Sequence, residues 1–140
     1  MSGIANIKFV GLDSNIFIYQ FEANPEFNHI TNTIFDRLSK NKLRAVTSII
    51  SLIESLSYPS PETILTQIKE GFTIPNLTVL EVNMEIGLEA ARIRREYGFR
   101  LGDAVQLATT TYSKTKVFIT NDERLKKFKE LKVILLSELK

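Results

Sequence analysis

The chain has 140 residues, of which 44% are hydrophobic and 24% are charged, a composition typical of one globular domain spanning residues 1–140. It has no cysteine and a single histidine, which excludes disulfides and thiolate zinc sites and leaves almost no candidates for a serine triad. The net charge of +2 is too small to indicate a polyanionic partner by itself. Any chemistry must therefore use carboxylates, hydroxyls, amides, lysines or arginines.

The N-terminal segment has no basic start, apolar core and small-residue cleavage site in succession. No apolar run approaches the roughly 18 residues that a membrane span needs. Together with the lack of cysteine, these features predict a soluble, cytoplasmic protein that makes no membrane contact.

The first predicted strand, residues 8–12, ends on Asp13, and the small polar residues Ser14 and Asn15 follow it. In open α/β sheets, ligands bind beyond the carboxyl ends of the strands, so a carboxylate at this position is expected in a cleft. The alternative is that Asp13 only caps the helical segment 16–19.

The next predicted elements are a helix, a strand and a second helix, over residues 26–40, 43–47 and 49–56. Glu54 lies in the second of these helices. An exposed helix face is the simplest explanation for it. However, no lysine or arginine occurs between Arg44 and Lys69, so this acid has no cationic neighbours in the sequence.

A helix from Glu62 to about Glu70 is predicted next, followed by a strand at 77–82 and the longest helix at 84–97. The longest helix carries three arginines in its last turns, at positions 92, 94 and 95. They complement the helix dipole. A second interpretation is that these arginines, together with Arg100, form a positively charged surface that binds phosphates.

A further helix begins at about residue 101, with Asp103 in its first turn. Stabilisation of a helix N-terminus by an acid, worth about 0.3 to 1 kcal/mol at an exposed site, would suffice to explain this residue alone. The strand at 116–120 then ends on Asn121 and Asp122. A short helix through 125–128 and a final strand at 133–136 complete the chain.

This alternation predicts an α/β fold: a three-layer α/β/α sandwich with a mostly parallel central sheet of about five strands. The strand carboxyl ends of such a sheet share one edge, so Asp13, Glu54, Asp103 and Asp122 are expected to converge there. Four carboxylates at close range repel unless a cation lies between them, and oxygen ligands suit Mg²⁺ or Mn²⁺. The matching chemistry is phosphodiester hydrolysis.

Four segments, in order, resemble the motifs of the PIN-domain ribonucleases, especially the small VapC-like toxins: Leu12-Asp13-Ser14-Asn15, Thr47-Ser48 leading to Glu54, Gly102-Asp103-Ala104, and Thr120-Asn121-Asp122. The resemblance implies that Asp13, Glu54, Asp103 and Asp122 bind the metal, beside the polar residues Asn15, Thr120 and Asn121. It also implies an RNA substrate, frequent homodimers and, for toxins, a neutralising antitoxin. Glu123-Arg124-Leu125 replaces an often aromatic position, which leaves Glu123 as an alternative fourth acid.

The leading hypothesis is a Mg²⁺- or Mn²⁺-dependent endoribonuclease that is the toxin of a toxin–antitoxin pair. Five cationic side chains are candidate RNA contacts: Arg92, Arg95, Arg100, Arg124 and Lys126. A housekeeping RNA-processing nuclease and a non-catalytic RNA- or protein-binding module are the alternatives. A receiver domain or a phosphatase is disfavoured, because no second carboxylate stands close after Asp13 to form a paired-acid motif.

Overall fold

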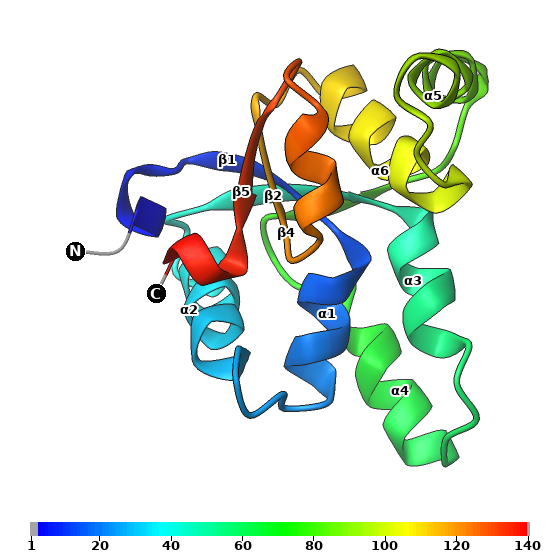
Figure 1. Ribbon diagram of the computed structural model, residues 1–140. Coiled ribbons are helices and arrows are strands. Elements are labelled where there is room, and N and C mark those ends of the chain that lie inside the picture. Colours follow the sequence, from blue (N-terminus) through cyan, green and yellow to red (C-terminus); the bar gives the residue numbers. More distant parts are fainter. Residues whose placement is uncertain (1–2, 140) are drawn as a thin grey trace.

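The computed structural model describes residues 3–139, which fold around one five-stranded sheet (Figure 1). The strands are β1 (Phe9–Leu12), β2 (Arg44–Ser48), β3 (Leu77–Leu80), β4 (Val117–Thr120) and β5 (Lys132–Leu135). Every pairing is parallel, and the order is β3-β2-β1-β4-β5. The central strand is therefore β1, and all five carboxyl ends lie at one edge of the sheet.

Helices cover both faces of the sheet (Figure 1). On one face lie α1 (Ser14–Phe21), α2 (Asn28–Ser39), α3 (Ile49–Leu56) and α4 (Glu62–Gly71). On the other lie α5 (Met84–Tyr97) and α6 (Leu101–Tyr112), and 3₁₀ turns occur at Gly3–Asn6, Glu123–Lys127 and Leu136–Leu139. The predicted three-layer α/β/α architecture is confirmed, with a sheet that is entirely parallel. Within residues 3–139, every helix is too short or too polar to span a membrane.

Two apolar layers hold the helices against the sheet, as the alternation of side chains along a strand requires. In β4, Ile119 packs with the core formed by α1 and α2, whereas Phe118 packs with α5 and α6. Both side chains are fully buried. Burial on two faces explains why the strands read as short apolar runs in the sequence.

Gly11 lets α6 approach the central strand directly. A β-carbon built on Gly11 would lie 2.1 Å from Thr110 Oγ1 and 2.9 Å from Thr110 Cβ. Only glycine leaves room for this approach. The position of α6, and of the polar residues in its first turns, is therefore set by its contact with β1.

The helix ends follow the local signals in most cases. Asn83 Oδ1 accepts a hydrogen bond from Ile86 N at 2.9 Å, and Gly98 ends α5 with a φ of 75°. The exception is α4, whose N-cap residue is Pro61, a residue with no side chain that can accept a capping hydrogen bond. The short helix predicted through residues 125–128 is instead the 3₁₀ turn Glu123–Lys127.

Candidate active site

Asp13 lies directly beyond the carboxyl end of β1 and is 5% exposed. Its Oδ1 accepts a hydrogen bond from Ser14 N at 2.8 Å, and its Oδ2 accepts one from Thr120 Oγ1 at 2.7 Å. Asp13 is the N-cap of α1, so the predicted cap is present. Capping occupies only one of its two oxygens, and the second faces the end of β4.

Thr120, the last residue of β4, connects three residues of the predicted site. Its hydroxyl donates to Asp13 and accepts from Asp122 N at 3.1 Å and from Asn15 Nδ2 at 3.3 Å. Asn15 Oδ1 is buried and has no hydrogen-bond partner among the described residues. An oxygen acceptor is therefore left without a donor beside the carboxylates.

Glu54 is joined to the site from α3 by Ser14. Ser14 Oγ donates to Glu54 Oε1 at 2.7 Å. Gln106 of α6 donates from Nε2 to Ser14 Oγ at 3.0 Å and to Ser51 Oγ at 2.7 Å. Its Oε1 accepts from Ser48 N at 3.2 Å, so one buried amide ties α6 to α1 and to the start of α3.

Ser14 and Gln106 belong to the site but were not predicted from the sequence. Gln106 carries a usable signal, because it is a large polar residue three positions after Asp103, among small and apolar residues. It is 1% exposed, and a buried amide requires partners. Ser14 has no such signal, since a serine after a capping acid is ordinary in sequence.

Arg124 links the remaining two acids. Its guanidinium pairs with Asp122 through Nη2 and donates from Nε to Asp122 Oδ1 at 3.0 Å, while Nη2 lies 3.3 Å from Asp103 Oδ2. These hydrogen bonds from Arg124 lower the pKa of Asp122. The pKa of Asp103 is raised, chiefly by burial and then by the neighbouring Asp122 carboxylate.

Asp13 is the most perturbed acid of the cluster. Burial raises the pKa of Asp13 from 3.8 to about 7, even though hydrogen bonds from Thr120 and Ser14 oppose the shift. The charges of Asp103 and Glu54 contribute smaller parts of this rise. The four acids are thus within electrostatic reach of one another, and the positive charge of Arg124 does not fully compensate them.

The donor set fits a divalent cation, although the cluster is not closed around one. Across residues 3–139, no three Asp, Glu, His or Cys side chains stand in positions that could hold a metal ion. Arg124 is the cation that approaches Asp103 and Asp122. A hard cation such as Mg²⁺ or Mn²⁺ binds oxygen donors, which is what this cluster supplies. It would also stabilise the charged forms of Asp13 and Asp103, whose pKa values are raised, and could accept the unpartnered Asn15 oxygen as a ligand.

Comparison with known proteins identifies the family. The family model described as PIN domain matches residues 10–131. This chain belongs to the PIN domain family. The match includes all four acids, from the end of β1 to the end of β4. No curated protein sequence matches the chain.

Solved structures share the PIN domain fold over nearly the whole chain. A toxin–antitoxin complex from Klebsiella pneumoniae contains a chain with a TM-score of 0.72 and 17% identity, covering 91% of this chain and 97% of that one. VapBC2 from Rickettsia felis, bound to a promoter DNA fragment, contains a chain with a TM-score of 0.71 and 16% identity. The match covers 91% of this chain and 98% of that one. DNA-bound VapBC from Salmonella typhimurium contains a chain with a TM-score of 0.69 and 22% identity. The match covers 93% of this chain and 98% of that one.

The cationic candidates of the PIN domain separate into two groups. Arg124 pairs with the acids, and the charge of Arg100 lowers the pKa values of Asp103 and Asp122, so both arginines lie at the site. Lys126 instead pairs with Glu138 at 2.6 Å and donates to Val133 O. Arg95 is exposed on α5. A phosphate contact by Arg95 stays a prediction.

Two further predicted residues have partners of their own. All five N–H groups of Arg92 donate to carboxylates, those of Glu89, Glu96 and Glu130. No donor of Arg92 remains for a phosphate, which argues against its predicted RNA contact. Asn121 donates from Nδ2 to Tyr19 Oη at 2.9 Å, so its amide supports the loop rather than the carboxylates.

Arg92→Ala is expected to lower the stability of the domain while leaving RNA cleavage unchanged. The network that it would remove joins α5 to Glu130, which also accepts from Tyr97 Oη at 2.6 Å. Partly exposed pairs of this kind contribute roughly 0.5 to 1 kcal/mol. Thermal unfolding should show a lower midpoint for this variant than for Arg95→Ala on the same helix. An unchanged midpoint with weakened RNA cleavage would restore Arg92 to the RNA contacts.

Proposed function

We propose that this PIN domain protein is a Mg²⁺- or Mn²⁺-dependent endoribonuclease. The observation that carries the proposal is the hydrogen-bonded connection of four acids at the carboxyl edge of the sheet. Thr120 connects Asp13 to the Asp122 backbone, Ser14 connects Glu54 to α1, and Arg124 bridges Asp103 and Asp122. Four carboxylates brought together from separate segments do not stabilise a fold by themselves, so their clustering indicates a functional site.

Asp13, Glu54, Asp103 and Asp122 are the residues that would hold the cation. When bound, the cation supplies charge neutralisation, orientation of the attacking water and stabilisation of the leaving oxygen. Thr120 keeps Asp13 Oδ2 in place, and Ser14 does the same for Glu54 Oε1. Gln106 fixes the Ser14 hydroxyl, so it acts as a positioning residue.

Arg124 and Arg100 are the proposed contacts for the scissile phosphate. The guanidinium of Arg124 neutralises Asp122 and approaches Asp103 where a cation would bind. With a cation held by Asp103 and Asp122, the planar donors of Arg124 would be free to bind a phosphate. Arg124 would then pair with the phosphate of the substrate instead of with the carboxylates.

The proposed biological role is that of a toxin held inactive by an antitoxin. Support comes from the similar solved structures, which are toxin–antitoxin complexes from Klebsiella pneumoniae, Rickettsia felis and Salmonella typhimurium. The pairing of this chain with an antitoxin and its assembly as a homodimer are parts of the proposal.

Cleavage should require both a divalent ion and Asp103. Purified wild-type protein and Asp103→Asn are incubated with structured and single-stranded RNAs in Mn²⁺, in Mg²⁺ and in excess chelator. We expect cleavage by the wild type in metal only, and none by the variant, because Asp103 contributes charge where Asp122 and Arg124 meet. Equal cleavage by the variant would indicate a contaminating nuclease. RNA binding without cleavage in any metal would favour a non-catalytic module.

A further inference from the structure

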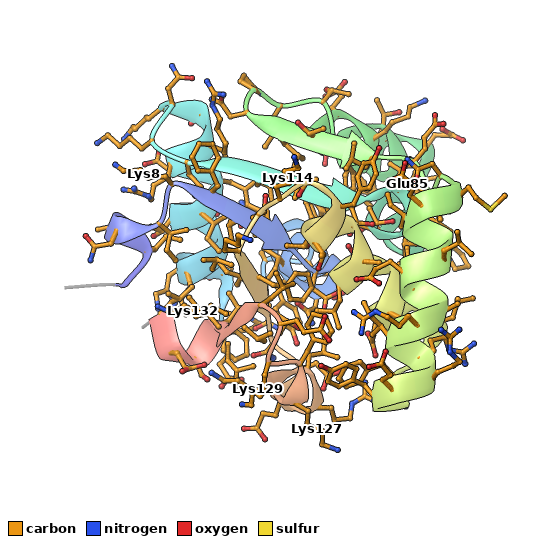
Figure 2. The ribbon with its side chains drawn as sticks, turned by 90° about the horizontal axis from the view of Figure 1, so that it is seen from above. Lys8, Glu85, Lys114, Lys127, Lys129 and Lys132 are labelled. Carbon is orange, nitrogen blue, oxygen red and sulfur yellow. The ribbon has the colours of Figure 1, made fainter. Side chains whose placement is uncertain are left out.

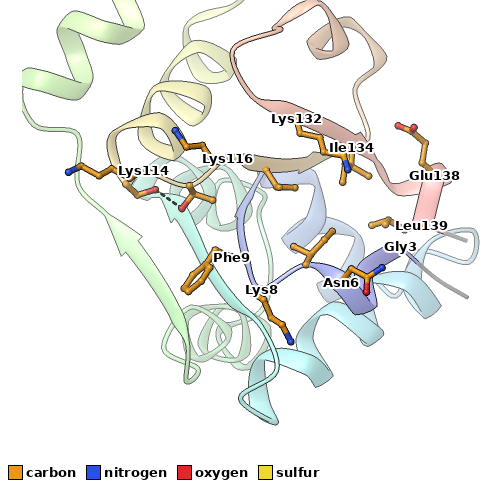
Figure 3. A pocket seen from close by; sticks show the side chains of 14 residues that line it. Gly3, Asn6, Lys8, Phe9, Lys114, Lys116, Lys132, Ile134, Glu138 and Leu139 are labelled. Atoms are coloured by element: carbon orange, nitrogen blue, oxygen red, sulfur yellow. Dashed lines mark hydrogen bonds between the residues drawn. The ribbon is translucent and has the colours of Figure 1, made fainter.

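A hollow lies at the opposite edge of the sheet from the acids. It has a volume of about 850 Å³ and is lined by the residues that begin β1, β4 and β5, together with residues 3, 6 and 7 and residues 138 and 139 (Figure 3). Because all strands are parallel, this amino edge is separated from Asp13 by the length of β1. The hollow is therefore not an extension of the candidate active site.

Four exposed lysines line this hollow: Lys8, Lys114, Lys116 and Lys132. We call it the lysine hollow. Within residues 3–139, none of the ion pairs involves any of these four side chains. The one acid in its lining, Glu138, pairs with Lys126 at 2.6 Å. Besides the hydrogen bond from Lys126, the charge of Lys132 lowers the pKa of Glu138, so this acid faces two lysines. The lysine hollow therefore carries four positive charges and one carboxylate, in a protein whose net charge is only +2.

Aromatic rings accompany these charges. Phe9 follows Lys8 directly, is 59% exposed, and lines the lysine hollow. It also lines an adjoining hollow of about 360 Å³, which contains Arg44 and Tyr112. Tyr112 is 43% exposed. An exposed ring beside lysines offers a stacking surface next to positive charge, and this combination suits a ligand that is both anionic and planar.

We infer that the lysine hollow binds a single-stranded segment of RNA. Lys8 and Lys116 contact its phosphates, and Phe9 stacks on an unpaired base. Lysines alone would suit any polyanion, whereas exposed rings between them suit bases that are free to stack. A duplex keeps its bases stacked on each other and offers Phe9 no partner. Figure 2 shows Lys8 and Lys132 on the side of the molecule away from α5.

The inference rests on the proposed ribonuclease function in one respect: the bound segment belongs to the RNA that is cut at the acidic edge. One substrate would then contact both edges of the sheet. The lysine hollow would select long RNAs with an unpaired segment. A substrate short enough to fill only the acidic edge would not reach it.

Binding is tested separately from cleavage. Fluorescence anisotropy follows a labelled single-stranded RNA of about 12 nucleotides in excess chelator, where no cleavage is expected. The test variants are Lys8→Glu/Lys116→Glu and Phe9→Leu. The control is Lys69→Glu/Lys127→Glu, which changes the net charge equally at exposed positions outside the hollow.

The lysine variant should bind at least about tenfold more weakly at low salt, with a logarithmic salt slope shallower by about 1.4 for two lost phosphate contacts. Phe9→Leu should also lose about tenfold, with an unchanged slope, because stacking carries no counterion release. The control should bind like the wild type. Equal losses in the control, or no effect of Phe9→Leu, would overturn the inference. Equally tight binding of poly-glutamate would instead indicate an acidic protein partner.

Cleavage kinetics distinguish the two proposals. With a long RNA in Mn²⁺, the lysine variant should lower kcat/KM by about the same factor as binding while leaving kcat unchanged. A short substrate should be cut equally by both proteins. Normal cleavage with no effect of the variants would refute the lysine hollow alone. Intact binding without cleavage by the wild type would refute the nuclease alone.

Discussion

Asp13→Asn is expected to abolish RNA cleavage and, in metal-free buffer, to stabilise the protein at pH 8. Loss of a residue that merely orients a metal ligand lowers activity or metal affinity by about 10- to 100-fold. Loss of a central acid should exceed that factor. The gain in stability has a separate cause, which is the cost of keeping a charged carboxylate at a buried position.

The pH dependence follows from the pKa of Asp13, which is 3.8 ordinarily and about 7 in the folded protein. Between these values the folded state binds a proton that the unfolded state has lost. Stability therefore falls as pH rises from about 4 to about 7, by about 4 kcal/mol in total. Asparagine has no proton to lose, so the variant keeps this stability at pH 8 and has no advantage below pH 4.

Thermal unfolding in chelator at pH 4, 6 and 8 measures the effect. The difference between Asp13→Asn and wild type should grow across the series. Asp36→Asn is a suitable control, because Asp36 is an exposed acid of α2 that pairs with Lys40. Its curve should run parallel to that of the wild type. A constant difference for Asp13→Asn at all three pH values would show that Asp13 titrates normally.

The layers of the fold could be predicted because each element carries its signal locally. Apolar runs that end on polar residues mark strands such as β1 and β4, and period-3.6 stripes mark the helices. The expected meeting of Asp13 and Asp122 needs only the rule that parallel strands end together. Glu54 was expected at the same edge, but its contact was not predicted, since it is joined to the site by Ser14, which lies forty residues away in the sequence.

The cationic residues show why the site itself was only partly predictable. Arg92 has acids three residues before and four residues after it, a spacing typical of ion pairs on a helix, so its structural role was visible in the sequence. The contact of Arg92 with Glu130 was not visible in the sequence, because α6 and β4 lie between the two residues along the chain. The lysines at the strand starts were also missed, since they are single charges dispersed over the sequence that gather only when the strands align.

Gly11→Ala is expected to be the most destabilising single-methyl change in the sheet. The new β-carbon would lie 2.1 Å from Thr110 Oγ1, closer than unbonded atoms can approach, so α6 must move away from β1. Overpacking of this kind costs about 1 to 3 kcal/mol, and the stiff, buried Thr110 side chain favours the upper end. Cleavage should fall as well, because α6 carries Asp103 and Gln106.

The cause can be isolated with a double variant and a matched glycine. Thr110→Ala removes two of the three nearest atoms, so Gly11→Ala/Thr110→Ala should be more stable than the sum of the single effects predicts. Gly87→Ala is the control, since a β-carbon there meets nothing within 4 Å and alanine favours the helix α5 by up to about 1 kcal/mol. Denaturant unfolding should therefore shift in opposite directions for the two glycines. Additive losses in the double variant would mean that the strand, and not its contact with α6, requires glycine at position 11.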